Sequence, residues 1–231
     1  MNKVVYGLAI SSFVALAGQA SAVTFSVDPS ASWIGYMNVF NLPQDGGAFQ
    51  FGGAWGTADL TATWAGPTLT LGTNNINDPN GYWYRGGGMA GAQGNKIMDA
   101  NMYVQIPDGT LAGQTLTFTG NVTSNSLFGH TDSLGNTWTS VAFIKDFVAD
   151  YSSFTITTVP LNAGVFSISH VLSSDSTHHF QYGFETVGSC VWATDAPLFG
   201  NIQLQAVPEP TTMAALGLGA LAMVRRRRAS R

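Results

Sequence analysis

Three consecutive aromatic residues, Tyr82, Trp83 and Tyr84, form the part of the sequence best suited to ligand chemistry. Polar, glycine-rich segments flank them at residues 77–81 and 85–88. Aromatic rings stack on the apolar C–H faces of pyranose rings, while neighbouring polar side chains bond the sugar hydroxyls. The segment is therefore a candidate platform for a sugar. Packing of at least two of the three rings in the core is the competing interpretation.

Residues 179–185 form a second candidate surface, because alternation along a strand divides their side chains between two faces. We expect one face to lie in the core, and it carries Phe180, Tyr182 and Phe184. The opposite face has the polarity of a concave binding sheet and carries His179, Gln181 and Glu185. Any strand that faces solvent has the same polarity, so both interpretations stay open here.

The surroundings of the isolated tryptophans divide them into two groups. Trp138 lies among threonines, and its indole is a candidate for stacking on a ligand. The others lie in apolar runs and are expected in the core: Trp33, Trp55 and Trp64.

Residues that usually carry catalysis are sparse. The sequence has no nucleophile elbow, phosphate-binding loop, zinc-hydrolase motif or dinucleotide fingerprint. A glycosidase needs two facing carboxyl groups, and Glu185 is the only glutamate between residues 23 and 206. We therefore expect a protein that is not an enzyme, with a polysaccharide hydrolase or lyase as the less favoured alternative.

The sequence assigns no metal or cofactor site. His178 and His179 point to opposite faces of a strand and cannot chelate one ion together. The loops at residues 74–81 and 132–136 contain calcium-type oxygen ligands but lack the EF-hand pattern, and Asx turns explain both. Calcium is the one ion that such loops suit, and nothing further in the sequence supports it.

The charge of the body becomes clear once the two terminal segments are set aside. Between residues 23 and 206 the basic residues are Arg85, Lys96 and Lys145, against twelve acidic ones. An acidic body without a cationic stripe predicts that the protein has no nucleic-acid partner and no attachment to anionic lipid.

Cys190 is the only cysteine. Val191 and Trp192 follow it and no basic residue is near, which predicts a buried, unreactive thiol.

Alternation of apolar and polar residues recurs along the body and predicts strand after strand. The clearest runs are residues 60–64, 68–71, 98–106, 115–123, 141–147, 154–157, 166–168, 180–184 and 202–205. Glycine-rich turns separate the runs, and no window has a helical period. About a dozen short strands predict one all-β domain over residues 23–206, a two-sheet antiparallel β-sandwich of the jelly-roll type.

The N-terminus has the three parts of a secretory signal peptide. Lys3 supplies the positive charge, residues 4–18 the apolar region, and Ala20 and Ala22 the small residues of a cleavage site. We expect signal peptidase to remove residues 1–22, including a short signal helix, so that the mature chain begins at Val23.

The C-terminus also has three parts. Its extended, proline-containing break is Val207, Pro208, Glu209 and Pro210. The apolar residues 211–224 follow, and their 14 residues would span about 21 Å as a short transmembrane helix. The basic tail, residues 225–231, starts with Arg225, Arg226, Arg227 and Arg228, which the positive-inside rule keeps on the cytoplasmic side.

This order of break, apolar span and arginine cluster resembles the PEP-CTERM sorting signal of Gram-negative bacteria. The resemblance implies that the chain is exported across the inner membrane. It further implies transient association with that membrane and processing by a membrane transpeptidase-like exosortase.

The second half of the body is similar to jelly-roll carbohydrate-binding modules of the galactose-binding-like superfamily. The similarity is carried by the Gln-x-Gly-Phe pattern at residues 181–184 and by Asp195 before the last strand. It implies a polysaccharide ligand.

Three functions follow from the sequence. The leading one is an exported, sorted cell-surface or extracellular-matrix protein, with a body that binds polysaccharide as an adhesion module. The alternatives are a structural matrix protein without a discrete ligand site and the polysaccharide hydrolase or lyase named above.

Overall fold

The computed structural model describes residues 22–127 and 129–207, which fold into strands joined by turns and loops. The strands are β1 (Ala22–Ser26), β2 (Trp33–Asn41), β3 (Phe49–Trp55), β4 (Ala62–Ala65), β5 (Thr68–Gly72), β6 (Lys96–Ile106), β7 (Thr115–Asn125), β8 (Thr139–Phe147), β9 (Phe154–Pro160), β10 (Gly164–Val171), β11 (His179–Ser189) and β12 (Asn201–Gln205). Two short helical turns accompany them: η1 (Pro43–Asp45) and α1 (Ala196–Phe199).

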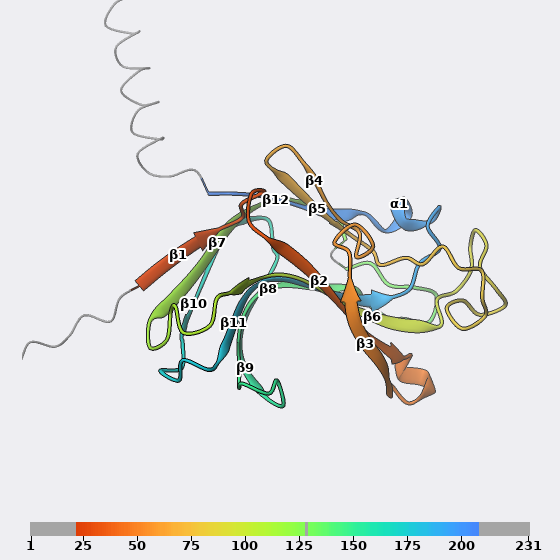
Figure 1. Cartoon of the computed structure of the whole chain (residues 1–231). Coiled ribbons are helices and arrows are strands. Elements are labelled where there is room, and N and C mark those ends of the chain that lie inside the picture. Colours follow the sequence, from red (N-terminus) through yellow and green to blue (C-terminus); the bar gives the residue numbers. More distant parts are fainter. Residues whose placement is uncertain (1–21, 128, 208–231) are drawn as a thin grey trace, which may run out of the picture.

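The strands form two six-stranded sheets (Figure 1). Sheet A has the order β1-β7-β12-β5-β4, with β10 paired to the other edge of β7. Sheet B has the order β3-β2-β6-β11-β8-β9. Their facing apolar side chains make one core, so the predicted all-β sandwich is confirmed.

The route of the chain is that of a jelly roll. From β5 to β8, successive strands alternate between sheets A and B, and the same alternation runs from β9 to β12. Strands of both sheets therefore depend on partners that are distant in sequence.

Period-two alternation explains most strands. In β6, Met98, Ala100 and Met102 point into the core, whereas Asp99, Asn101 and Tyr103 belong to the opposite face. In β11 the predicted division holds, because Phe180, Tyr182 and Phe184 are buried in the core. Each residue type thus lies on the side that its polarity requires.

The N-terminal half differs from the sequence prediction in three places. The alternation did not predict β1, β2 or β3; β3 is largely exposed and contains two adjacent glycines, which weaken its pattern. The strand expected at residues 60–64 begins only at Ala62, because Thr61 adopts a left-handed φ of 57° in the preceding turn. Finally, β1 pairs with β7 in parallel, so the sandwich is not wholly antiparallel. The two strands are far apart in sequence, and no hairpin fixes their relative direction.

Both terminal segments of the described chain belong to sheet A. Ala22, predicted to be the last residue of the signal peptide, starts β1, and β12 ends at Gln205, two residues before the described chain ends at Val207. The rest of the predicted signal peptide, including Ala20, and the tail from Pro208 to Arg231 lie outside the described residues. Within the described residues no helix is long and apolar enough to span a membrane.

Candidate functional site

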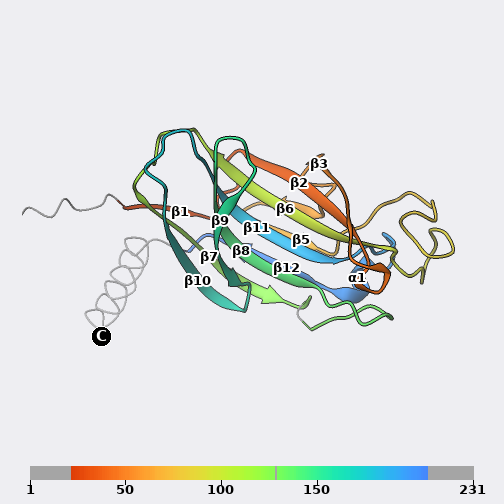
Figure 2. The same ribbon diagram turned by 90° about the horizontal axis from the view of Figure 1, so that it is seen from below.

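A groove of about 720 Å³ lies on the face of sheet B that points away from sheet A. In Figure 1 sheet B arches, with β9 and β3 descending on either side of its open face. Figure 2 views the molecule from below and shows β2, β6, β11 and β8 running side by side. The groove is lined by Tyr36, Asn38, Asp99, Asn101, Tyr103, Lys145, Phe147, Tyr151, Phe154, Ile156, Gln181 and Glu185.

Strand register places the floor residues beside one another. Glu185 pairs with Asn101, and Asn101 pairs with Tyr36, so three neighbouring strands contribute one row. In the next row Gly183 lies between Phe143 and Tyr103 and adds no side chain to the floor. Its missing Cβ would come within 2.2 Å of the Met102 carbonyl oxygen, so any larger residue would disturb the β11–β6 pair.

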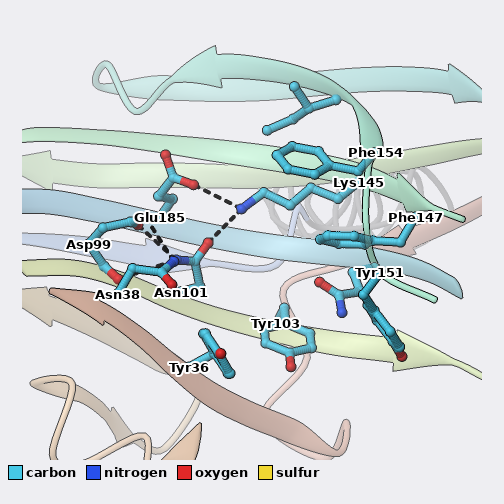
Figure 3. A pocket seen from close by; sticks show the side chains of 12 residues that line it. Tyr36, Asn38, Asp99, Asn101, Tyr103, Lys145, Phe147, Tyr151, Phe154 and Glu185 are labelled. Carbon is cyan, nitrogen blue, oxygen red and sulfur yellow. Dashed lines mark hydrogen bonds and ion pairs between the residues drawn. The ribbon is translucent and has the colours of Figure 1, made fainter. Parts of the chain in front are cut away.

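A chain of hydrogen bonds crosses this floor (Figure 3). The Asn38 amide donates to Asp99 Oδ2 over 3.1 Å, and the Asn101 amide donates to Asp99 Oδ1 over 2.7 Å. Lys145 Nζ then donates to Asn101 Oδ1 over 2.6 Å and to Glu185 Oε2 over 2.9 Å. Four strands are connected in this way, so the polar groups of the floor hold one another in place.

Lys145 is the cation at the centre of this network and is 8% exposed. Its ammonium group lies 4.2 Å from the centre of the Phe143 ring and 5.7 Å from that of Phe154. These aromatic faces attract the cation, and they cover it from solvent.

Asp99 and Glu185 lie on the same face of neighbouring strands, since Val187 pairs with Asp99 and Glu185 with Asn101. Burial raises the pKa of Asp99 above its usual value, and the negative charge of Glu185 raises it further. The amides of Asn38 and Asn101 and the charge of Lys145 act in the opposite direction. The floor therefore carries two interacting carboxyl groups and one cation.

Aromatic side chains form the walls of the groove. Tyr36 is 37% exposed, and Tyr151 and Phe154 are also exposed. Burial raises the pKa of Tyr103, and the phenol groups of Tyr151 and Tyr36, which line the same groove, raise it further. The walls thus offer flat apolar rings together with polar hydroxyl groups.

The loop between β8 and β9 brings Tyr151 to one end of the groove. Tyr151 has a left-handed φ of 57°, and its N–H donates to the Val148 carbonyl over 2.9 Å. Its ring is stacked on His179 with a centroid distance of 4.2 Å. His179 Nε2 lies 3.0 Å from the Ala149 carbonyl oxygen of the same loop, so the imidazole supports both the ring and the backbone.

Two of the sequence-predicted residues, Gln181 and Glu185, line this groove, and His179 lies at its end beneath Tyr151. Gln181 donates to the Gln105 amide oxygen over 2.8 Å, and Glu185 accepts from Lys145. Strand alternation therefore identified the residues of β11 that face the groove.

Trp138 is not available for stacking, which corrects the sequence prediction. Its side chain is 2% exposed and packs on Phe199 at a centroid distance of 4.7 Å. Gly188 makes room for the indole, because a Cβ there would lie 1.9 Å from Trp138 Cδ1. The threonines around Trp138 suggested that its ring is exposed. The missing side chain of Gly188 instead leaves space in which the indole is buried.

Of the two interpretations of Tyr82, Trp83 and Tyr84, the structure agrees with packing of two rings and not with a three-ring platform. Tyr84 is completely buried, and its hydroxyl donates to the Val191 carbonyl over 3.0 Å. Trp83 is partly buried against the core, and Tyr82 meets it edge-on at an interplanar angle of 86°. Lys96 Nζ lies 4.4 Å from the centre of the Tyr82 ring, so one face of the single exposed ring is already occupied.

Most of the groove residues on β2, β6, β8 and β9 were not predicted from the sequence. A usable signal was present in β6. The residues that alternate with its apolar ones, and so point away from the core, are Asp99, Asn101 and Tyr103. On β8 no such signal existed, because each face of this strand mixes apolar and charged side chains, with Lys145 on one face and Asp146 on the other. Tyr151 had no such signal, because a loop has no period.

Among the described residues no three histidine, cysteine, aspartate or glutamate side chains are placed to hold a metal ion. The two loops singled out as calcium-like form Asx turns, in which Asp78 Oδ1 accepts from the Asn80 N–H and Asp132 Oδ1 from the Leu134 N–H. Cys190 is buried as predicted, and burial raises its thiol pKa to about 11.

Residues 206–228 match the PEP-CTERM protein-sorting motif. No curated protein and no solved structure matches the chain significantly. The matched segment begins with the residue that follows β12 and contains Pro208, Glu209 and Pro210. The motif implies export, with an exosortase as the processing partner, and sorting towards the cell surface.

Proposed function

We propose that this protein binds polysaccharide in the groove of sheet B after export and C-terminal sorting. The observation that carries the proposal is the composition of the groove, in which tyrosine and phenylalanine rings stand beside a floor of amide, carboxyl and ammonium groups. Sugar rings present apolar C–H faces together with hydroxyl groups, and this pairing of surfaces suits them.

The floor is held in place before any ligand binds, which favours recognition. Asn101 is fixed between Asp99 and Lys145, and Lys145 between Asn101 and Glu185. Side chains that are already ordered lose little conformational entropy on binding. Hydrogen bonds to sugar hydroxyls replace those to water at little net gain, so we expect modest affinity at a single groove.

We propose binding rather than catalysis for the two floor carboxyl groups. Both oxygens of Asp99 accept hydrogen bonds from amides, and Glu185 accepts one from Lys145. A general acid must present its proton to the leaving group. Both oxygens of Asp99 and one oxygen of Glu185 are already engaged as acceptors, which supports a binding role.

The sorting motif supports a place of action at the cell surface or in the extracellular matrix. In this proposal signal peptidase removes the N-terminal segment, and the C-terminal segment holds the chain at the inner membrane until the exosortase acts. The groove lies on sheet B, whereas the first and last described strands, β1 and β12, belong to sheet A, so tethering through either end of the described chain would leave the groove accessible.

Retardation of the purified body in native gels containing soluble polysaccharides tests the proposal. We expect Tyr36→Ala to weaken retardation, because the substitution removes a wall of the groove. Tyr82→Ala is the matched control, since both tyrosines are 37% exposed and Tyr82 lies outside the groove.

Absence of retardation in a broad set of polysaccharides would contradict the proposal and favour a structural matrix protein. Equal weakening by Tyr36→Ala and Tyr82→Ala would show that binding is not located in the groove.

A further inference from the structure

We infer that the groove takes a neutral glycan and rejects glycans that carry uronate, sulfate or phosphate groups. This inference rests on the proposed function and specifies its ligand class. It follows from two observations: the basic residues of the domain already have partners within the protein, and the groove floor carries two carboxyl groups.

Lys145, the one cation among the groove residues, already has hydrogen-bond partners within the protein. Lys145 Nζ donates to Asn101 and Glu185, and aromatic rings lie beside it. A site for an anionic sugar needs a lysine or arginine whose donors face the ligand. Binding a uronate at Lys145 would require breaking its contact with Glu185 and exposing that carboxylate to the incoming charge.

The remaining charges of the floor repel anions. Asp99 and Glu185 lie on neighbouring strands, and Lys145 can balance only one of them. Burial raises the pKa of Asp99, and the charge of the neighbouring Glu185 raises it further, which is consistent with this crowding. An anionic polymer in the groove would meet the same repulsion.

The other basic residues of the body are engaged elsewhere. Arg85 forms an ion pair with Asp45, and Lys96 lies over the Tyr82 ring. Neither residue lines the groove. Between residues 23 and 206 twelve acidic residues outweigh the three basic ones, so the field around the domain also opposes polyanions.

The groups left to meet a ligand suit uncharged hydroxyls. The walls contribute the hydroxyls of Tyr36, Tyr103 and Tyr151, and Gln181 adds an amide. These groups donate and accept hydrogen bonds without requiring a charge on the sugar. Stacking on their rings is equally independent of ligand charge.

Pairs of polymers that share a backbone and differ in charge test the inference by native-gel retardation. Suitable pairs are hydroxyethylcellulose with carboxymethylcellulose, dextran with dextran sulfate, and methyl-esterified with free polygalacturonate. We expect the neutral member of any bound pair to retard the protein at least tenfold more strongly at low salt. Addition of 500 mM sodium chloride, which shortens the Debye length to a few ångströms, should narrow that difference.

Glu185→Gln tests the cause of the discrimination. The substitution removes one negative charge and releases the Lys145 ammonium group. The affinity for the charged polymer of a pair, divided by the affinity for the neutral one, should therefore rise roughly tenfold. Asp78→Asn changes the net charge equally, lies outside the groove, and keeps an oxygen acceptor for its Asx turn. We expect it to leave the ratio unchanged.

Stronger retardation by the charged member of a pair would overturn the inference while leaving polysaccharide binding intact. A ratio that responds equally to Glu185→Gln and Asp78→Asn would overturn the assignment of the discrimination to the groove floor. Lack of binding to every polymer would reject the proposed function and the inference together.

Discussion

The imidazole of His179 lies parallel to the phenol ring of Tyr151, with centroids 4.2 Å apart and 5° between the planes. His179 Nδ1 lies 2.8 Å from Asp108 Oδ1, and Nε2 lies 3.0 Å from the Ala149 carbonyl oxygen. Both partners accept hydrogen bonds, so an imidazolium that donates from both nitrogens satisfies them together. This contact connects the protonation of a strand residue to the position of a groove wall.

The first prediction concerns pH. The hydrogen bond to Asp108 raises the pKa of His179 above its ordinary value near 6.5, although desolvation opposes the shift. Because the folded-state pKa is raised, the stabilising effect is complete below the unfolded value and is lost as pH rises through the folded one. We therefore expect glycan affinity to fall on the alkaline side of pH 6.5, as Tyr151 loses its support.

Affinity titrations between pH 5.5 and 9, with the His179 resonance followed by NMR, check this prediction. His179→Gln should remove the pH dependence, and Asp108→Asn should move its midpoint to lower pH. An unchanged profile in His179→Gln would place the titrating group elsewhere.

The second prediction separates the Tyr151 ring from its turn. Glycine adopts the left-handed conformation of residue 151 readily, so Tyr151→Gly keeps the backbone and removes the ring. We expect weaker glycan binding at a nearly unchanged melting temperature. Tyr151→Ala should reduce both, because alanine keeps the backbone strain that tyrosine bears at this positive φ and loses the ring contacts with Phe147 and His179.

Glycan binding by Tyr151→Gly at the strength of the unchanged protein would exclude Tyr151 from the site. The measurements are native-gel retardation and thermal unfolding of the same preparations.

The third prediction concerns the packing of Trp138 on Gly188. Trp138→Ala should lower the free energy of unfolding by about 3–5 kcal/mol, as for other buried aromatic residues. Gly188→Ala should also destabilise the fold, because its Cβ would overlap the indole ring. In the Trp138→Ala background the added cost of Gly188→Ala should largely disappear, since the overlapping ring is absent.

Urea unfolding of the four proteins gives this double-mutant cycle. Additive losses would mean that the two residues do not interact. A small loss for Trp138→Ala alone would contradict the burial of the indole.

The fourth prediction concerns processing. We expect protein recovered from the cell surface to lack residues 1–22, because these have the pattern of a cleavable signal peptide. We also expect it to lack most of residues 211–231, because the matched sorting motif begins directly after β12. Intact-mass measurement decides the result, and a surface protein that still ends in Arg231 would make the tail a simple anchor. Neutral residues in place of Arg225–Arg228 should weaken retention at the inner membrane before processing.

The sequence determined the features that depend on local order. The sorting tail is readable because its break, apolar span and arginines follow one another directly. Period-two alternation fixed which side of residues 179–185 enters the core, and thereby placed Gln181 and Glu185 on the groove face. Both results need only the spacing of neighbouring residues.

Tertiary structure decided which residues meet and which are covered. Asn38 and Asp99 are 61 positions apart and Lys145 and Glu185 are 40 apart, yet strand register joins them in one network. Composition around Trp138 indicated an exposed ring, whereas the facing Gly188 encloses it. Local sequence determines the period of a strand but not which strand lies beside it. The groove, which is formed by several neighbouring strands, therefore could not be predicted from the sequence.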